Sequence, residues 1–119
     1  MLGASWPREV TAPVVAAPQL NPVDVFFAIG HELRWQMLQM LAGGAALCAR
    51  DVAAALQRDF DGVRKHLLVL RDAGAVVAKP ATDARFILYS IPEQYRTQPG
   101  TVDYGCCVVR FPIRNPPAA

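Results

Sequence analysis

Apolar residues recur at every third or fourth position over residues 21–42, and this spacing predicts two short helices. The first is expected to begin at Asn21-Pro22, because asparagine caps a helix and proline suits the first helical position, and to end at Gly30. The second is expected to end at Gly43-Gly44. The expected inward-facing positions of the two helices are Val25, Phe26, Ile29, Leu33, Met37, Met40 and Leu41.

Two further amphipathic helices are predicted over residues 49–56 and 59–73, separated by a tight turn. Cys48 precedes the first in a cap-like position, and Asp59 can cap the second, which should end before Gly74. The expected inward-facing positions are Val52, Ala55, Leu56, Val63, Leu67 and Leu70. A short helix, a turn and a longer helix with basic residues on its outer face are typical of a helix-turn-helix, which lays its second helix in the major groove of DNA.

Residues that favour strands dominate the rest of the chain. The segments 75–79 and 85–91 flank a five-residue loop, 80–84, and predict a hairpin, while 92–100 is turn-like and 102–111 predicts one more strand. A helix-turn-helix followed by a hairpin is a winged helix. We therefore predict a mainly α fold with a small β-hairpin wing (α+β), a winged helix-turn-helix with an extra C-terminal strand.

The distribution of proline predicts the organisation of the chain. Pro7, Pro13 and Pro18 interrupt residues 1–20, which are expected to form an extended or disordered arm. The winged helix-turn-helix domain is expected over residues 21–91. Residues 92–119 are expected to contain a turn, the C-terminal strand and a Pro-rich tail.

Composition narrows the classes of function. The 119 residues are 53% hydrophobic and 18% charged, which is typical of a globular protein. We find no signal-peptide pattern and no apolar stretch long enough to span a membrane, so we expect a cytoplasmic protein without membrane association. A net charge of +2 is too small to predict nucleic-acid binding, so the local placement of basic residues must support it.

Three segments together resemble the ArsR-type winged-helix transcriptional regulators of bacteria, over about residues 21–91. They read FFAIGHELRWQMLQML, LCARDVAAAL and VRKHLLVLRDAGAVV. The last two are similar to the family's helix-turn-helix and the start of its wing. The resemblance implies a dimeric repressor that releases its operator when it senses a metal ion, a metalloid or another effector.

Two features depart from the family pattern. The family has small hydroxyl residues at the start of the recognition helix, where this chain has Asp61, Gly62 and Arg64, and this predicts an altered operator or weaker binding. The family's C-terminal dimerisation helix has no expected counterpart, because residues 102–111 favour a strand and proline follows at Pro112. A homodimer is still expected, through another surface.

The outer face of the 59–73 helix carries the predicted contacts to double-stranded DNA. Arg64 and Lys65 can bond to guanine or reach a phosphate. Asp61 can accept from a cytosine amino group or can stabilise the helix N-terminus, and both interpretations remain open. Gly62 lies on the same surface.

The wing adds two candidate contacts, because Lys79 and Arg85 bracket it and cations there contact the DNA backbone or the minor groove. The local charge excess is small, so an ordinary solvated face is the competing interpretation. Six basic residues between positions 58 and 85 stand against four acidic ones: Arg58, Arg64, Lys65, Arg71, Lys79 and Arg85 against Asp59, Asp61, Asp72 and Asp83.

The cysteines and histidines are interpreted mainly as structural residues. Cys48 stands at the first cysteine of the family's thiolate-sensor motif, but Arg50 replaces the second. A soft-metal site needs two or three thiolates, which Cys106 and Cys107 could supply only if their strand folds back or reaches across a dimer. We therefore predict no metal site and no cofactor, and we expect His31 and His66 to cap or pack.

The sequence thus predicts a sequence-specific DNA-binding transcriptional regulator, a repressor acting as a homodimer, whose effector is not identified. One alternative is a protein-interaction module without DNA binding that pairs through the strand at 102–111. Another is a thiol- or metalloid-responsive sensor that uses Cys48 with Cys106 or Cys107. No phosphate-binding loop or nucleophile motif supports an enzyme.

Overall fold

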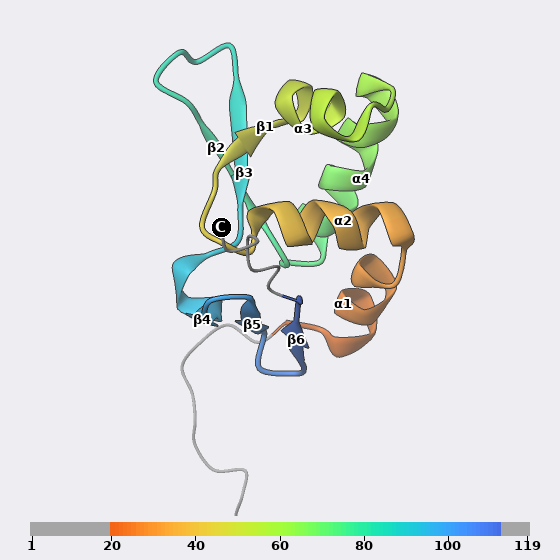
Figure 1. The fold of residues 1–119 in the computed structure, drawn as a ribbon, viewed down its shortest axis with the longest axis vertical. Coiled ribbons are helices and arrows are strands. Elements are labelled where there is room, and N and C mark those ends of the chain that lie inside the picture. The colour runs from red at the N-terminus through yellow and green to blue at the C-terminus, as the bar shows by residue number, and fades with distance from the viewer. Residues whose placement is uncertain (1–19, 113–119) are drawn as a thin grey trace, which may run out of the picture.

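The computed structural model describes residues 20–112, which form four α-helices and two small antiparallel sheets (Figure 1). Nearly all of the predicted arm, residues 1–19, and the tail at 113–119 lie outside the described residues. The helices are α1 (Pro22–Ile29), α2 (Glu32–Leu41), α3 (Ala49–Leu56) and α4 (Phe60–Asp72). The strands are β1 (Leu47–Cys48), β2 (Val77–Pro80), β3 (Ile87–Ser90), β4 (Arg96–Gln98), β5 (Thr101–Asp103) and β6 (Val108–Arg110).

Side-chain caps fix the starts of three helices. The Asn21 side chain accepts from two backbone N–H groups at the start of α1, and Asp59 accepts from the N–H of Gly62 at 2.8 Å at the start of α4. His31 caps α2, because its Nδ1 accepts from the N–H of Leu33 at 3.1 Å. The predicted caps at Asn21 and Asp59 are confirmed, and His31, which was expected to cap or pack, caps α2. Cys48 precedes α3 as predicted, but its side chain makes no capping hydrogen bond.

The turn of the helix-turn-helix is three residues long, from Gln57 to Asp59. Gln57 adopts a left-handed conformation with a φ of 55°, and its N–H donates to a carbonyl of the last turn of α3. This conformation ends α3 sharply. The chain therefore turns directly into α4.

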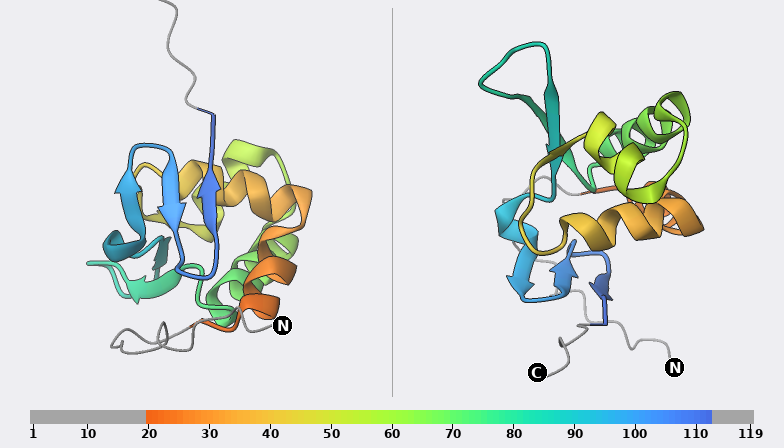
Figure 2. Two further views of the ribbon diagram at one scale, coloured as in Figure 1. Left: turned by 90° about the horizontal axis from the view of Figure 1, so that it is seen from below. Right: turned by 45° about the horizontal axis from the view of Figure 1, so that its top comes forward.

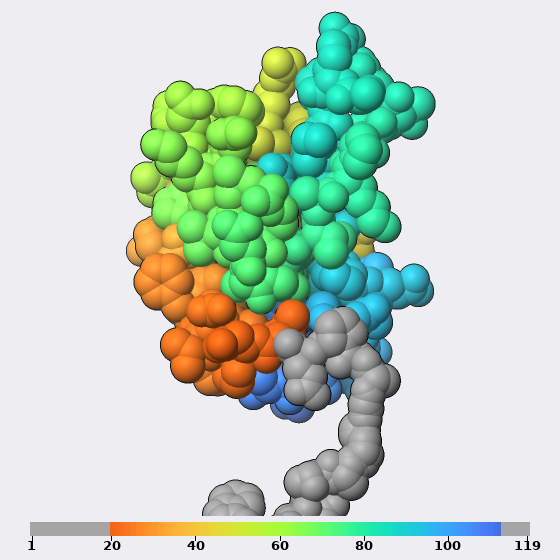
Figure 3. All heavy atoms as spheres, turned by 180° about the vertical axis from the view of Figure 1, so that it is seen from behind, coloured from red at the N-terminus to blue at the C-terminus, as the bar shows by residue number. Residues whose placement is uncertain are grey.

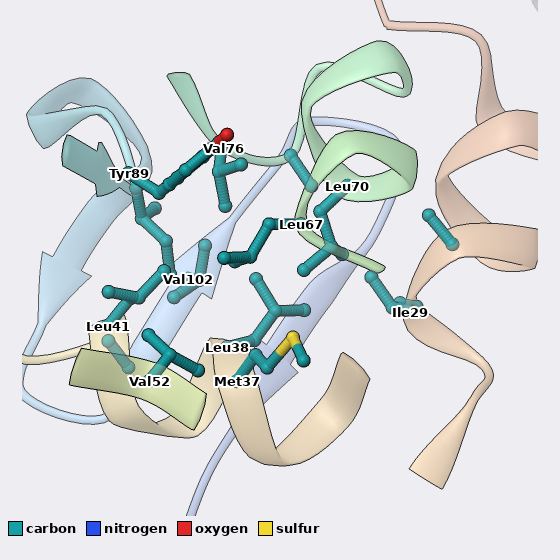
Figure 4. Close-up of a cluster of buried hydrophobic side chains, with 14 of the residues drawn as sticks. Ile29, Met37, Leu38, Leu41, Val52, Leu67, Leu70, Val76, Tyr89 and Val102 are labelled. Carbon is teal, nitrogen blue, oxygen red and sulfur yellow. The ribbon is translucent and has the colours of Figure 1, made fainter. Parts of the chain in front are cut away.

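A single apolar core joins the four helices to both sheets. Leu67 and Leu70 of α4 are fully buried and face α2 across the core (Figure 4). Two expected inward positions are wrong. Phe26 is 52% exposed while Ala28 packs in the core, and Ala55 is exposed while Ala53 is buried. The fully buried large side chains are Val25, Met37, Leu38, Leu41, Val52, Val63, Leu67, Leu70, Val76, Ile91 and Val102.

The wing is the predicted hairpin. Strands β2 and β3 pair in antiparallel register from Val77↔Ser90 to Pro80↔Ile87, and the loop between them spans residues 81–86 rather than 80–84. The two-residue strand β1, which the sequence analysis did not predict, pairs with the other edge of β3. Cys48 lies in this strand, opposite Leu88.

A second sheet, in the order β4-β5-β6, replaces the single strand expected at 102–111. That prediction was wrong because the chain reverses at Gly105, whose φ is +89°, and the N–H of Tyr104 bonds to the carbonyl of Cys107 at 2.9 Å. Residues 92–100 are also more than a turn, since they contain a 3-10 helix, η3 (Glu93–Tyr95), and β4. The sheet lies across α2 at the end opposite the wing (Figures 1 and 2).

Candidate nucleic-acid interface

The elements of the helix-turn-helix and the wing lie at one end of the molecule. Helix α3, the turn and the first part of α4 lie beside the projecting hairpin of β2 and β3 (Figures 1 and 2). Figure 3 shows the surface of α4 next to the wing, with α1 below it. The first turns of α4 are therefore open to a large partner.

Packing of one face of α4 decides which residues the other face presents. Val63, Leu67 and Leu70 are fully buried, so Arg64, Lys65 and Asp61 point outward and are exposed. Among residues 20–112, the ion pairs are Arg71–Asp72 and Arg85–Asp83, so neither Arg64 nor Lys65 is neutralised by a carboxylate there. The predicted outward face is confirmed as an exposed surface, and DNA contact by its residues stays a prediction.

Two arginines that the sequence analysis did not select extend this surface. Arg50 on α3 and Arg58 in the turn are exposed, and both line a shallow pocket of about 410 Å³ that Phe60 of α4 also borders. The sequence places Arg50 on the outward face of its helix and Arg58 among the local basic residues, but it does not predict either as a contact to DNA. Their position beside α4 depends on how α3 packs, which the sequence pattern does not reveal.

Arg85 is exposed in the wing loop but is held by an acidic neighbour. Its guanidinium donates to both carboxylate oxygens of Asp83, the shortest contact being 2.7 Å. These hydrogen bonds, with a further one from the Arg85 backbone N–H, lower the pKa of Asp83. The positive charge at the tip of the wing is therefore compensated within the loop.

Phe86 links the wing to the helix-turn-helix. The guanidinium carbon of Arg50 lies 5.5 Å from the centre of the Phe86 ring, and that of Arg85 lies 5.8 Å from it. Two cations from different elements are thus gathered around one aromatic ring. Through Arg50, this contact joins the wing loop to α3.

Lys79 lies apart from the other candidates. It is exposed on β2, and with Val77 it lines a wide hollow bordered by Ser90 and by Arg96 of the second sheet. Alternate residues of a strand point to opposite faces, so Lys79 is on the face of the wing that borders η3 and β4. The structure therefore groups Arg50 and Arg58 with α4 and places Lys79 beside the second sheet.

The balance of charge at this end stays mildly positive. Residues 50–85 contain seven basic and five acidic side chains. Removal of the two ion pairs, Arg71–Asp72 and Arg85–Asp83, leaves five basic residues against three acidic ones. One of these three, Asp59, is occupied as the cap of α4.

The cysteines do not gather into a metal site in the described part of the chain. Cys106 and Cys107 lie in the turn between β5 and β6, not within a strand as predicted, and Cys48 lies in β1. Within residues 20–112, no three His, Cys, Asp or Glu side chains are placed to hold a metal ion. Burial raises the pKa of Cys107 to about 11, with Cys106 and Asp103 adding to the shift, which keeps this thiol protonated and poorly reactive.

The last strand offers little edge for a partner strand. β6 is the outer strand of the second sheet, but it spans only Val108–Arg110. Short edge strands are poor templates for strand addition. Of the helices in residues 20–112, none is both long and apolar enough to cross a membrane.

Comparison with known proteins identifies the fold. No protein-family model matches the chain, and no curated protein matches it by sequence. Among solved structures it is similar to HlyU from Vibrio cholerae, with 24% identity and a TM-score of 0.54 over 62% of this chain and 78% of that one. It is also similar to the transcriptional regulator HlyU from Vibrio vulnificus, with 28% identity and a TM-score of 0.53 over 62% of this chain and 75% of that one. The predicted α+β winged helix-turn-helix is confirmed.

Proposed function

We propose that this protein is an ArsR-type, sequence-specific DNA-binding transcriptional regulator that acts as a homodimeric repressor and not as an enzyme. One observation carries the proposal. A three-residue turn places α4 beside a projecting wing, and the outward face of α4 presents Arg64 and Lys65 without carboxylate partners in the described residues. The likeness to a solved transcriptional regulator, HlyU, supports the same function.

The proposed contacts divide by what each side chain can reach. Arg64 and Lys65 enter the major groove, where arginine reads guanine and both residues reach phosphates. Arg50 and Arg58 contact the backbone beside α3, because the first helix of such a motif crosses the phosphates. Arg85 contacts the DNA backbone from the wing, where a phosphate replaces Asp83 as the partner of its guanidinium.

Gly62 gives independent support for a close partner at the start of α4. Glycine inside a helix costs about 0.5–1 kcal/mol relative to alanine. A Cβ at position 62 would meet only the Oδ2 of Asp59, at 3.4 Å, which is ordinary van der Waals contact, so packing does not require glycine here. Close approach of a DNA backbone to α4 would account for glycine at this position, whereas the packing of the fold does not.

The homodimer is proposed to form through α1. Val23, Phe26 and Phe27 on this helix are 73%, 52% and 69% exposed, and large apolar side chains exposed together mark interaction surfaces. No α-helix follows α4 in the described residues, so the family's C-terminal dimerisation helix has no counterpart there. Two copies double the modest set of basic contacts.

The oligomeric state tests this surface. Sedimentation equilibrium of the whole protein is expected to give a dimer, and the double variant Val23→Asp/Phe26→Asp a monomer. The control is Ile87→Asp on β3, which is 41% exposed and lies in the wing, at the other end of the molecule from α1 (Figure 1), and it should remain dimeric. A monomeric wild type, or a double variant that still dimerises, would contradict the proposed interface.

DNA binding is tested with a duplex selected by the wild-type protein from a random-sequence pool. The double variant Arg64→Ala/Lys65→Ala is expected to lose at least about tenfold in affinity and to show a shallower salt dependence, by about one unit of slope per lost phosphate contact. The matched control, Arg71→Ala/Arg110→Ala, removes the same charge elsewhere and should bind almost as the wild type does. Equal affinity of the two double variants would contradict the proposal that α4 is the recognition helix.

The remaining parts of the proposal follow from the role of the protein. A DNA-binding regulator works where the chromosome is, so we propose a cytoplasmic location. Repression and an effector rest on the resemblance to the ArsR family. Selection of a duplex, followed by transcription from a template that carries it, distinguishes a repressor from an activator.

A further inference from the structure

Arg34, in the first turn of α2, is the one charged side chain that is buried among residues 20–112, with 7% of its surface exposed. No carboxylate forms an ion pair with it in that part of the chain. A buried guanidinium is costly unless hydrogen bonds satisfy it. Its neutral partners therefore determine what it does.

Two of these partners are carbonyls at the end of α1. The Nε of Arg34 donates to the carbonyl of Ala28 at 2.7 Å, and an Nη donates to that of Phe27 at 3.4 Å. Carbonyls in the last turn of a helix lack partners within the helix and carry its negative dipole. The guanidinium also lies 5.3 Å from the centre of the Phe27 ring. Arg34 thus fixes the end of α1 to α2.

The third partner is on the recognition helix. The other Nη of Arg34 lies 3.1 Å from Nδ1 of His66 on α4. Arginine has only donors, so this Nδ1 must be the unprotonated acceptor and the ring must be neutral. The ring of His31 lies 4.5 Å away, and its Nδ1 is likewise occupied as an acceptor, from the N–H of Leu33. Burial, His31 and Arg34, in that order, lower the pKa of His66.

We propose that Arg34 is a positioning residue for the recognition helix, which it holds through the neutral ring of His66, so that acidification releases α4 and weakens DNA binding. This inference rests on the proposed function. Protonation of His66 at Nδ1 removes the acceptor and places a cation against the guanidinium. His66 follows Lys65 directly and Arg64 by two positions, so a shift of His66 displaces both reading residues.

The surroundings of His66 determine the sign of the effect. From α2 it faces Arg34 and His31, and the neighbouring α1 supplies only carbonyls and the Phe27 ring to the cluster. Glu32, the acidic residue next to His31, is exposed and pairs with neither histidine in the described residues. A lowered pKa means that the native contact is complete above the ordinary histidine pKa of about 6.5 and is lost as the pH falls through the lower pKa that His66 has in the folded protein.

The expected direction is opposite to that of simple electrostatics. A histidine that gains a proton close to phosphates normally strengthens DNA binding. Here the same proton breaks the contact that orients α4, so affinity falls as the solution becomes acidic. The direction of the pH profile therefore separates a positioning role from a charge effect.

The first test measures affinity for the selected duplex between about pH 8 and pH 5, the range in which histidine titrates. The wild type is expected to lose at least about fivefold in affinity on acidification. His66→Asn keeps an acceptor oxygen near the position of Nδ1 but does not titrate, so its affinity should change less than about twofold. The matched control, His31→Asn, keeps a good helix cap and retains His66, so its affinity should also fall on acidification, with a midpoint at higher pH because one cause of the lowered His66 pKa is removed.

A second test needs no DNA and remains informative if His66→Asn folds poorly. Amide hydrogen exchange in α4 of the wild type is expected to accelerate on acidification, after correction for the intrinsic rate, in step with the titration of the His66 ring followed by NMR. Arg34→Lys keeps the charge but removes the planar guanidinium, whose N–H groups bond to both α1 and His66. The amides of α4 should therefore exchange faster even near pH 8.

The outcomes separate the two proposals. If the wild type binds no duplex at any pH, the proposed function fails, while exchange in α4 still decides whether Arg34 and His66 hold that helix. If the wild type binds DNA with constant or rising affinity on acidification, the positioning role of Arg34 through His66 is overturned. The same conclusion follows if α4 exchange does not respond to the titration of His66.

Discussion

The two ends of this molecule use similar elements but differ in what their side chains contact. At the end formed by β4, β5 and β6, inward side chains such as Val102 and Val109 are buried against α2 and the rest of the core. At the other end, the wing and the first turns of α4 present charged side chains, including Arg64 and Lys65. Packing in the core explains the side chains at the first end. The exposed charged side chains at the second end have no such role in the core and are available to a partner.

The largest effect is expected from a cavity under the second sheet. Phe111 is 5% exposed and its ring centre lies 4.7 Å from that of Trp35 on α2. Phe111→Ala should lower the free energy of unfolding by about 3–5 kcal/mol, because truncation removes buried surface and leaves a void. Chemical denaturation measures this loss, and affinity per folded molecule should not change. Thr97→Ala, at an exposed position of β4, is the control and should be nearly neutral.

A smaller loss is expected where the second sheet meets the start of the wing segment. The hydroxyl of Tyr104 donates to the carbonyl of Ala75 at 3.0 Å, and both residues are buried. Tyr104→Phe keeps the ring but leaves that carbonyl unsatisfied, so the free energy of unfolding should fall by about 1–2 kcal/mol. The midpoint of thermal unfolding, compared between the wild type and the variant, measures this loss. An unchanged midpoint would show that water replaces the hydroxyl.

The same contrast explains which elements the sequence could predict. The four helices have eight or more residues, enough for their apolar period and their caps at Asn21 and Asp59 to be recognised. The strands of the second sheet have three residues each and β1 has two, which is too short for alternation to be visible. The reversal at Gly105 was missed because the apolar run around it masked the turn.

The candidate site divides in the same way. Helical periodicity predicted that Arg64 and Lys65 would lie outside, because it depends only on spacing along α4. Spacing could not predict that Arg34 is buried, that Arg50 approaches Phe86 or that Lys79 lies beside the second sheet. Each of these depends on how separate elements pack against one another.

The contact between the wing and α3 can be weakened without removing charge. Phe86→Leu keeps an apolar side chain but removes the ring that Arg50 and Arg85 approach, so Arg50 loses its contact with the wing while Arg85 stays paired with Asp83. We expect affinity for the selected duplex to fall by about fivefold. Phe86→Tyr retains the ring and should restore binding, which filter binding or fluorescence anisotropy would measure. Equal affinity of the Leu and Tyr variants would mean that the ring does not position the wing.

Gly62 should show opposite effects on stability and on binding. Gly62→Ala is expected to raise the free energy of unfolding by about 0.5–1 kcal/mol through helix propensity, while lowering affinity for the duplex by about threefold because a methyl group faces the backbone of DNA. Gly43→Ala is the control, since a Cβ there meets nothing within 4 Å and the position lies outside α4. A Gly62→Ala variant that binds as well as the wild type would remove the argument for a close approach.

The smallest expected change concerns the acidic partner of Arg85. Asp83 holds the guanidinium through three hydrogen bonds at the tip of the wing, so a phosphate must displace a carboxylate before Arg85 can bind DNA. Asp83→Asn removes the competing charge and should raise affinity by about two- to threefold, with a steeper dependence on salt. Asp72→Asn frees Arg71 from an equivalent pair at the far end of α4 and should have no effect. A gain in both variants would indicate a general effect of net charge, whereas a gain in Asp83→Asn alone would identify the wing as a contact with the DNA backbone.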